Sequence, residues 1–191
     1  MTVTQNDVPD VGGLTIGILG GTGDQGRGLA YRFARAGHPV LLGSRDAERA
    51  QQAAAALGPG VRGAANATVA AEADVVIVAV PWAGHESTLK SLAAELAGKI
   101  VVDCVNPLGF DKQGAYALPV AEGSAAQQAQ ALLPESRVVA AFHHVSAVLL
   151  LDPQVTDLNL DVLVLGDDRE ATDIVQALAS RLPGVRGVYG G

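Results

Sequence analysis

The feature that most constrains how this chain can fold is the glycine-rich segment GGTGDQG at residues 20–26. An apolar run typical of a buried strand precedes it at residues 15–19, and helix-forming residues follow at 27–36. Between a strand and a helix, the pattern G-x-G-x-x-G is the fingerprint of a loop that holds a dinucleotide pyrophosphate. The competing interpretation is a glycine turn without a ligand.

The glycines of this loop have separate physical roles. The first, Gly21, permits the tight turn, Gly23 lets the backbone approach the pyrophosphate, and Gly26 allows the helix to pack closely on the strand. The N–H groups and the dipole at the start of the helix attract the anion, and Thr22 adds a hydroxyl donor. The predicted pyrophosphate-binding residues are Gly21, Thr22, Gly23, Asp24, Gln25 and Gly26.

A second signal lies about 20 residues past the loop, where the fingerprint expects the residue that reads the ribose. NAD-binding folds place an acid there to accept the ribose 2′-OH. Here Ser44 and Arg45, with Arg49 one helical turn later, would instead attract a 2′-phosphate through charge-assisted hydrogen bonds. The sequence therefore predicts NADP(H) rather than NAD(H). Asp46 and Glu48 leave open a surface salt-bridge cluster as the alternative.

Strands and helices alternate along the rest of the chain. Strands are expected at residues 15–19, 39–42, 61–64, 75–80, 100–103, 138–142 and 161–165, and helices at 27–36, 46–57, 82–96, 124–133 and 169–182. Asn66 is expected to cap a further short helix, and residues 108–122 are expected to be an irregular loop over a site. This alternation predicts an α/β protein with a Rossmann-type doubly wound, mainly parallel sheet in three α/β/α layers.

The domain organisation is expected to be simple. Residues 1–13 are predicted to be a flexible N-terminal tail, and residues 14–191 a single NADP-binding Rossmann domain. The longest apolar stretch, at residues 75–80, is far short of the roughly 18 residues that a membrane helix needs. The first ten residues lack the pattern of a signal peptide, so we expect a cytoplasmic protein that does not bind membranes.

Composition excludes other classes of function. The net charge of −7, the aromatic content of 4% and the lack of any Lys/Arg run argue against nucleic-acid binding. The single cysteine, Cys104, excludes an intramolecular disulfide and a cysteine metal cluster, and no metal site is predicted. Cys104 has no activating neighbour in the sequence, so a buried, inert thiol is expected.

Further candidate residues follow predicted strands, at the edge where open α/β sheets bind ligands. Trp82 would be either a wall of the cleft or a hydrophobic plug, and Asn106 either a cofactor contact or part of a turn. His143 and His144 are adjacent and point in different directions, which makes them poor joint metal ligands. One of them could line the cleft or supply a proton near neutral pH, and the alternative is a capping or surface histidine.

Several spaced segments together resemble the NADPH-dependent coenzyme F420 reductases, also called F420H2:NADP oxidoreductases. These segments are residues 18–30 (ILGGTGDQGRGLA), 43–45 (GSR), 78–82 (VAVPW), 103–108 (DCVNPL), 124–126 (SAA) and 138–143 (VVAAFH). The resemblance extends from residue 14 to the end of the chain, with the motifs in the family's order. It implies a homodimer that transfers a hydride between NADP(H) and the deazaflavin coenzyme F420.

The resemblance also implies roles for individual residues. By this resemblance, the 2′-phosphate would lie at Thr22, Ser44, Arg45 and Arg49. The nicotinamide would lie near Val80, Trp82 and Ala147. The deazaflavin would stack over the nicotinamide, near residues 143–147. His143 and Val145 are candidates that line the cleft. No catalytic side chain is assigned, because the hydride passes directly between the nicotinamide C4 and the deazaflavin C5, which must approach to roughly 3–3.5 Å.

Family members usually continue with a C-terminal helix rich in apolar and basic residues, which helps to close the deazaflavin site and the dimer interface. This chain ends at Gly191, so that contribution is expected to be missing here. Two other functions remain open. One is an NADP-dependent reductase with a flavin-like acceptor, since the cytosolic domain of membrane metalloreductases also has Gly-Ser-Arg after its second strand. The other is a noncatalytic NADP-binding sensor that keeps the loop and Arg45 but lacks a second ligand pocket.

Overall fold

The computed structural model describes residues 8–191. Residues 1–7 of the expected tail lie outside the described part of the chain. Val11, also within the expected tail, is only 4% exposed and belongs to the hydrophobic core. The packed part of the domain therefore begins before residue 14.

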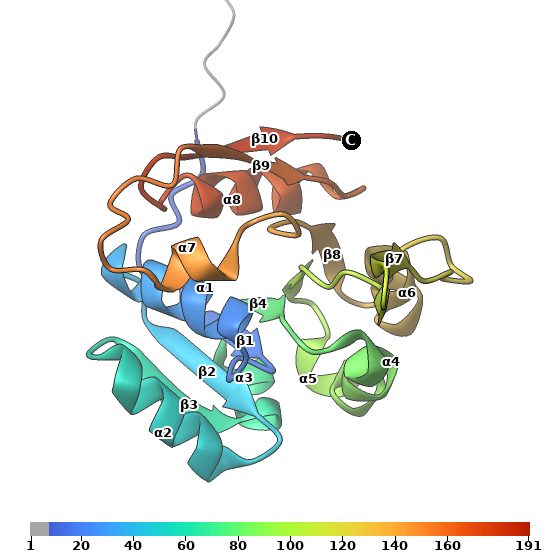
Figure 1. The fold of residues 1–191 in the computed structure, drawn as a ribbon, viewed down its shortest axis with the longest axis horizontal. Helices are drawn as coiled ribbons and strands as arrows, with labels where there is room; N and C mark the ends of the chain where they lie inside the picture. The colour runs from blue at the N-terminus through green and yellow to red at the C-terminus, as the bar shows by residue number, and fades with distance from the viewer. Residues whose placement is uncertain (1–7) are drawn as a thin grey trace, which may run out of the picture.

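Six parallel strands form the central sheet, in the order β3-β2-β1-β4-β5-β8 (Figure 1). Their bounds are Ile16–Leu19 for β1, Val40–Ser44 for β2, Val61–Ala65 for β3, Val75–Val78 for β4, Ile100–Asp103 for β5 and Arg137–Ala140 for β8. The strand order reverses between β1 and β4, and doubly wound sheets bind ligands at the carboxyl edge of this switch point. The predicted Rossmann-type sheet is confirmed.

Helices cover both faces of the sheet, which gives the predicted three layers (Figure 1). One face carries α1 Asp24–Arg35, α2 Ala47–Leu57, α7 Ala147–Leu151 and α8 Arg169–Ala179. The other face carries α3 Asn66–Glu72, α4 Trp82–Ser91, α5 Ala93–Leu96 and α6 Ala125–Leu132. Neighbouring strand residues alternate between the two cores, Ile18 in the first and Leu19 in the second, which explains strands that are apolar on both faces.

Side-chain caps fix where α2, α6 and α8 begin, and at α8 Asp168 Oδ1 accepts the N–H of Ala171. Asp46 Oδ1 accepts the N–H groups of Glu48 and Arg49 at the start of α2, and Ser124 caps α6 in the same way. The expectation that Asn66 caps α3 was wrong, because Ala65 is the N-cap residue. Asn66 Oδ1 instead accepts the N–H of Gly20, 3.2 Å away, and so ties α3 to the glycine loop.

Several elements differ from the prediction. The segment expected to be an irregular loop contains an antiparallel hairpin of β6 Leu108–Asp111 and β7 Gly114–Ala117, beside α6 in Figure 1. The expected strand at 161–165 is β9 Leu160–Val164, which pairs in parallel with β10 Val185–Tyr189 in a separate two-stranded sheet. A single bridge joins Ala140 to Leu165.

Two further elements differ from their expected bounds. The strand predicted to reach residue 142 ends at Ala140, and Phe142 adopts a φ of 65° although it is buried. That left-handed conformation is strained for a bulky side chain and cannot continue a strand. The helix predicted over 82–96 is divided at Leu92 into α4 and α5.

Candidate functional site

Three adjoining cavities lie along the carboxyl edge of the sheet. The glycine-loop cavity, about 680 Å³, lies between the glycine loop, the end of β2 and the start of α4. The central cavity, about 530 Å³, is lined by Trp82 and shares Gln25 and Val80 with the first. The hairpin cavity, about 870 Å³, lies beside β6–β7 and α6 and shares Asn106 and His143 with the central one. The shared residues make these cavities one trough with two ends.

The glycine loop has the close packing that its fingerprint predicts. A Cβ at Gly26 would lie 2.5 Å from Gly21 Cα, so only glycine allows α1 to start this close to the end of β1. The N–H of Gly21 donates to Gly43 O at 2.8 Å, which fixes the loop to the end of β2. A Cβ at Gly23 would meet nothing nearer than Gly20 O at 4.0 Å. Protein packing therefore demands a glycine at 26, whereas at 23 the space beside the backbone is open.

The N-terminus of α1 presents free hydrogen-bond donors. The first N–H groups of an α-helix have no acceptor within the helix, and the N-cap residue of α1, Gly23, has no side chain that could accept from them. The carboxylate of Asp24 is held by Arg27 at 2.6 Å. Gln25 and Gly26 of this first turn line the glycine-loop cavity. Free N–H groups at the positive end of a helix dipole suit the pyrophosphate of a dinucleotide.

Ser44, Arg45 and Arg49 come together at the far end of the same cavity. Ser44 is buried, and its Oγ accepts the N–H of Asp46 at 3.2 Å, so its hydroxyl hydrogen can still be donated. Both arginines are exposed, and neither forms an ion pair with any residue in 8–191. This argues against the alternative of a surface salt-bridge cluster, and the Asp46 carboxylate instead caps α2.

Polar residues that the sequence analysis did not assign to a ligand site also line this cavity. They are Asn66 from α3 and Ser87 and Thr88 from α4. Asn66 directly follows β3, so its place at a strand end was a signal that could have found it. Ser87 and Thr88 follow no strand directly and belong to no motif, and only the three-dimensional fold brings them to the site.

Trp82 is the first residue of α4 and lies beside the central cavity. Its ring is half-buried, lines the cavity and stands against the His85 ring, with the centroids 5.2 Å apart. Pro81 and Val80, at the end of the preceding strand, line both the central and the glycine-loop cavities. Of the two interpretations of Trp82, the position fits a cavity wall rather than a plug inside the core.

The turn after β8 forms another side of the central cavity. Gln25 Nε2 donates to Phe142 O at 3.3 Å, and Asn106 Nδ2 donates to His143 O at 2.8 Å. These bonds join the turn to the glycine loop and to the end of β5. Burial lowers the pKa of His143, and this effect is larger than the opposing effect of the Asp103 carboxylate, which raises it. The His143 ring that lines the cavity is therefore neutral near pH 7.

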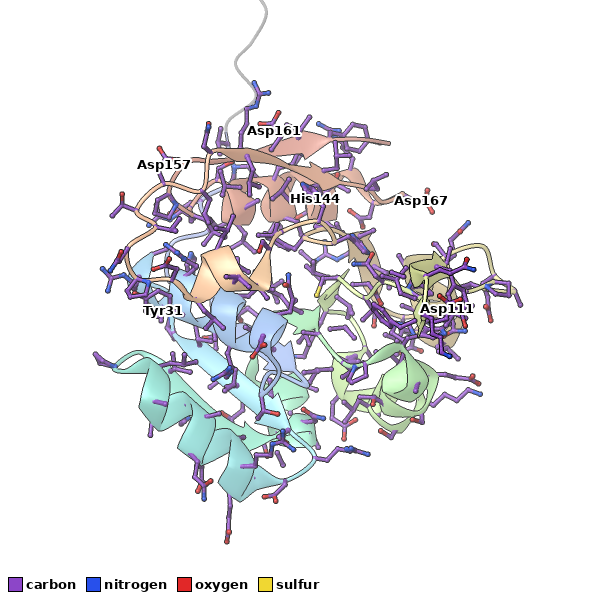
Figure 2. The ribbon with its side chains drawn as sticks, viewed as in Figure 1. Tyr31, Asp111, His144, Asp157, Asp161 and Asp167 are labelled. Atoms are coloured by element: carbon purple, nitrogen blue, oxygen red, sulfur yellow. The ribbon has the colours of Figure 1, made fainter. Side chains whose placement is uncertain are left out.

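The remaining candidates point elsewhere. His144 Nε2 lies 2.7 Å from Asp161 O, and Figure 2 shows His144 below the β9–β10 sheet. His143 instead lines the central cavity, so the adjacent histidines diverge as predicted. Val145 is buried in the core, and Ala147 starts α7, which packs on α1, so neither is among the residues lining the three cavities. Cys104 is buried, as expected, and its Sγ donates to Val78 O. Burial raises its pKa to about 12, so an inert thiol stays the prediction.

A buried pair, His85 and Asp103, lies behind Trp82 and was missed by sequence reasoning. Asp103 ends β5 and was noted only as part of a motif, and His85 lies within α4. In the part of the chain that the structure describes, no group of three or more His, Cys, Asp or Glu side chains is arranged to hold a metal ion.

Comparison with known proteins identifies the family. Residues 15–107 match the family model described as NADP oxidoreductase, coenzyme F420-dependent. The F420-dependent NADP reductase of Methanothermobacter marburgensis is 40% identical over 187 residues, which cover 92% of this chain and 83% of that protein. This chain belongs to the F420-dependent NADP reductase family.

A solved structure and a further relative extend this result. The structure of a putative F420-dependent NADP-reductase from Arthrobacter sp. FB24 superposes with a TM-score of 0.77 at 33% identity, covering 93% of this chain and 85% of that one. The metalloreductase STEAP3 of Rattus norvegicus is 38% identical over 86% of this chain, but the match covers only 31% of that protein. In residues 8–191 there is no helix long and apolar enough to cross a membrane.

Proposed function

We propose that this protein is an oxidoreductase that transfers a hydride between NADP(H) and coenzyme F420. Membership of the F420-dependent NADP reductase family supports this activity. The observation that carries the proposal is the trough, in which a cavity with free anion-binding groups opens into a second cavity that has an aromatic wall. When both cofactors are bound, their rings supply the hydride chemistry, and the protein supplies position and electrostatics.

The residues proposed to bind NADP(H) follow the glycine-loop cavity. The free N–H groups of Asp24, Gln25 and Gly26, next to Gly21 and Gly23, would hold the pyrophosphate. The free cations support a 2′-phosphate site, whose proposed residues are Thr22, Ser44, Arg45 and Arg49. An acidic residue, which would repel that phosphate, is missing from the end of β2, since Ser44 and Arg45 occupy that position.

The central cavity is the proposed place of hydride transfer. Val80 and Trp82 would bound the nicotinamide, and Asn106 and His143 would face the deazaflavin from the β5 and β8 ends. Neutral His143 would present no charge to either ring. Ala147 is retained as a proposal from the family resemblance. The hydride goes to C5 of the deazaflavin, and the proton that completes the reduced ring is taken from water, so no side chain is proposed to exchange a proton in the reaction.

The test is to mix the protein with NADPH and the oxidised deazaflavin and to follow the deazaflavin absorbance. The proposal predicts that NADPH bleaches the absorbance and that NADH does so far more slowly. A protein that binds NADPH without bleaching would be the noncatalytic sensor. Replacing the deazaflavin with a flavin tests the flavin-linked reductase, and faster reduction of the flavin would contradict the proposal.

We also propose that the protein acts as a homodimer in the cytoplasm. The family resemblance supports a dimer, as do exposed apolar side chains of α7, Val148 and Leu149. The single free thiol of Cys104 is consistent with a reducing compartment. Sedimentation velocity of the purified protein at increasing concentration would measure the oligomeric state, and a monomer at every concentration would contradict the dimer.

A further inference from the structure

A buried polar cluster behind the central cavity has no role in the function proposed so far. It joins His85 of α4, Asp103 at the end of β5 and Gln128 of α6. The side chains of His85 and Asp103 are both 0% exposed. His85 Nε2 lies 2.6 Å from Asp103 Oδ2, and His85 Nδ1 lies 2.9 Å from Gln128 Oε1. Each ring nitrogen of His85 therefore has its own partner.

The orientation of Gln128 determines how many protons His85 carries. Gln128 Nε2 donates to Glu122 Oε2 at 3.3 Å, so the amide oxygen of Gln128 is the atom that faces His85. Carboxylate and amide oxygens both accept, so both His85 nitrogens donate and the ring is an imidazolium. Burial lowers the pKa of His85, but the hydrogen bond and charge of Asp103, with smaller help from Gln128 and Glu86, raise it overall.

The cluster contacts two parts of the central cavity. The His85 ring stands 5.2 Å from the Trp82 ring, tilted by 31°, which places a cation against the face of the indole. Asp103 Oδ1 accepts the N–H of Val105 at 3.0 Å and so holds the turn that leads to Asn106. Trp82, Val105 and Asn106 all line the central cavity. One buried ion pair therefore supports two walls of this cavity.

We propose that His85 is a positioning residue for hydride transfer. Held as an imidazolium between Asp103 and Gln128, it fixes the indole of Trp82 so that the central cavity has the width that stacking of the two cofactor rings requires. This inference rests on the proposed function, because it takes the central cavity as the place where the two rings meet. A displacement of about 1 Å at reacting centres can cost up to about a hundredfold in rate, so the support of one wall has a kinetic effect.

The experiment uses the fluorescence of Trp82, the only tryptophan of the chain. An imidazolium quenches a stacked indole more strongly than a neutral imidazole does. Asp103→Asn keeps the side-chain shape but removes the charge that holds the second proton on His85. We expect brighter Trp82 emission, a kcat lowered about tenfold, and a Kd for NADPH within about twofold of the unmodified protein. Ser91→Ala, an exposed change on the same helix, is the control and should alter none of the three.

A second variant keeps the inference testable if Asp103→Asn does not fold. His85→Gln retains a donor for Asp103 but carries no charge, and it should likewise brighten Trp82 and lower kcat. Folded variants with unchanged Trp82 emission, or with changed emission and unchanged kcat, would overturn the positioning role. Failure of the proposed function is separate, because it would appear as absent deazaflavin reduction by the unmodified protein. The emission comparison is made without either cofactor.

Discussion

The glycine-loop cavity and the central cavity of the trough use charge in opposite ways. At the glycine-loop end, Arg45 and Arg49 are exposed, close in sequence and free of ion pairs within residues 8–191. At the central cavity, His85 and Asp103 are buried, 18 residues apart and paired with each other at 2.6 Å. The arginines are therefore available to pair with a charged ligand, whereas His85 and Asp103 already neutralise each other.

The energetic cost explains this difference. An exposed guanidinium is solvated by water, so leaving it without a partner costs little, and its pairing energy remains available for a phosphate. A buried ion that loses its partner costs about 3–5 kcal/mol, so the His85–Asp103 pair is held in one geometry. We infer that the free charges of the glycine-loop cavity recruit the ligand and that the paired charges behind the central cavity hold its walls in place.

The largest expected effect comes from Gly23→Ala. The added Cβ meets only open space in the protein, so the melting temperature should not change. The same methyl group would stand between the backbone and the pyrophosphate, and loss of two charge-assisted bonds predicts at least about a hundredfold weaker NADPH binding. Isothermal titration and thermal unfolding measure the two quantities.

Gly26→Ala is the matched comparison for that prediction. Its Cβ would lie 2.5 Å from Gly21 Cα, so this variant should also lose stability. Equal losses of stability in the Gly23 and Gly26 variants would show that both glycines serve packing alone.

A smaller effect is expected for Arg45→Ala. Removing a charged donor to the 2′-phosphate should weaken NADPH binding by roughly 10–100-fold and leave NADH binding unchanged, since NADH has no such phosphate. The control is Arg62→Ala, which removes an exposed arginine that already pairs with Glu72. Equal affinity of the unmodified protein for NADPH and NADH would contradict the assignment of this end of the trough.

The buried pair predicts a pH-dependent stability of modest size. The pKa of His85 is raised in the folded state, so its stabilisation is fully present below about pH 6.5, the ordinary value. It is lost as pH rises through the raised folded value. The melting temperature should fall across that range, and Asp103→Asn should abolish this decline. A decline of the same size in Asp103→Asn would assign it to other groups.

The smallest expected effect concerns Cys104. Its thiol lines the central cavity, but its pKa is raised to about 12, so almost no thiolate exists at pH 8. We expect no alkylation of the folded protein in an hour and reaction of one thiol once guanidinium unfolds it. Rapid alkylation of the folded protein would mean that the walls of the central cavity move enough to expose the Cys104 thiol, which would contradict the inference that the His85–Asp103 pair holds them in place.

The glycine-loop cavity and the central cavity also differ in how far the sequence predicted them. The glycine loop follows from the spacing of residues within one strand–loop–helix unit, and Ser44, Arg45 and Arg49 follow from their fixed distance of about 20 residues past that loop. The strand–helix alternation likewise predicted the parallel sheet, since each buried strand is a continuous apolar run. These parts depend on short-range patterns that one sequence displays.

The central cavity depends on contacts that no local pattern displays. Gln128 is 43 residues from His85, and the hydrogen bonds that fix the turn after β8 join it to Gln25 and Asn106. The left-handed φ of Phe142, which ends β8 early, is unexpected for a bulky aromatic residue. The β6–β7 hairpin is mostly exposed, so it lacks the hydrophobic alternation that marks a strand.

Transfer of an isotope label tests the central claim of direct hydride transfer most directly. The unmodified protein is mixed with the oxidised deazaflavin and NADPH that carries deuterium at C4, in ordinary water, and the reduced deazaflavin is analysed by mass spectrometry. Direct transfer within the trough predicts that deuterium from one face of the nicotinamide appears at C5 of the product. A reduced product without the label from either face of the nicotinamide, with the hydrogen drawn from solvent, would contradict the account.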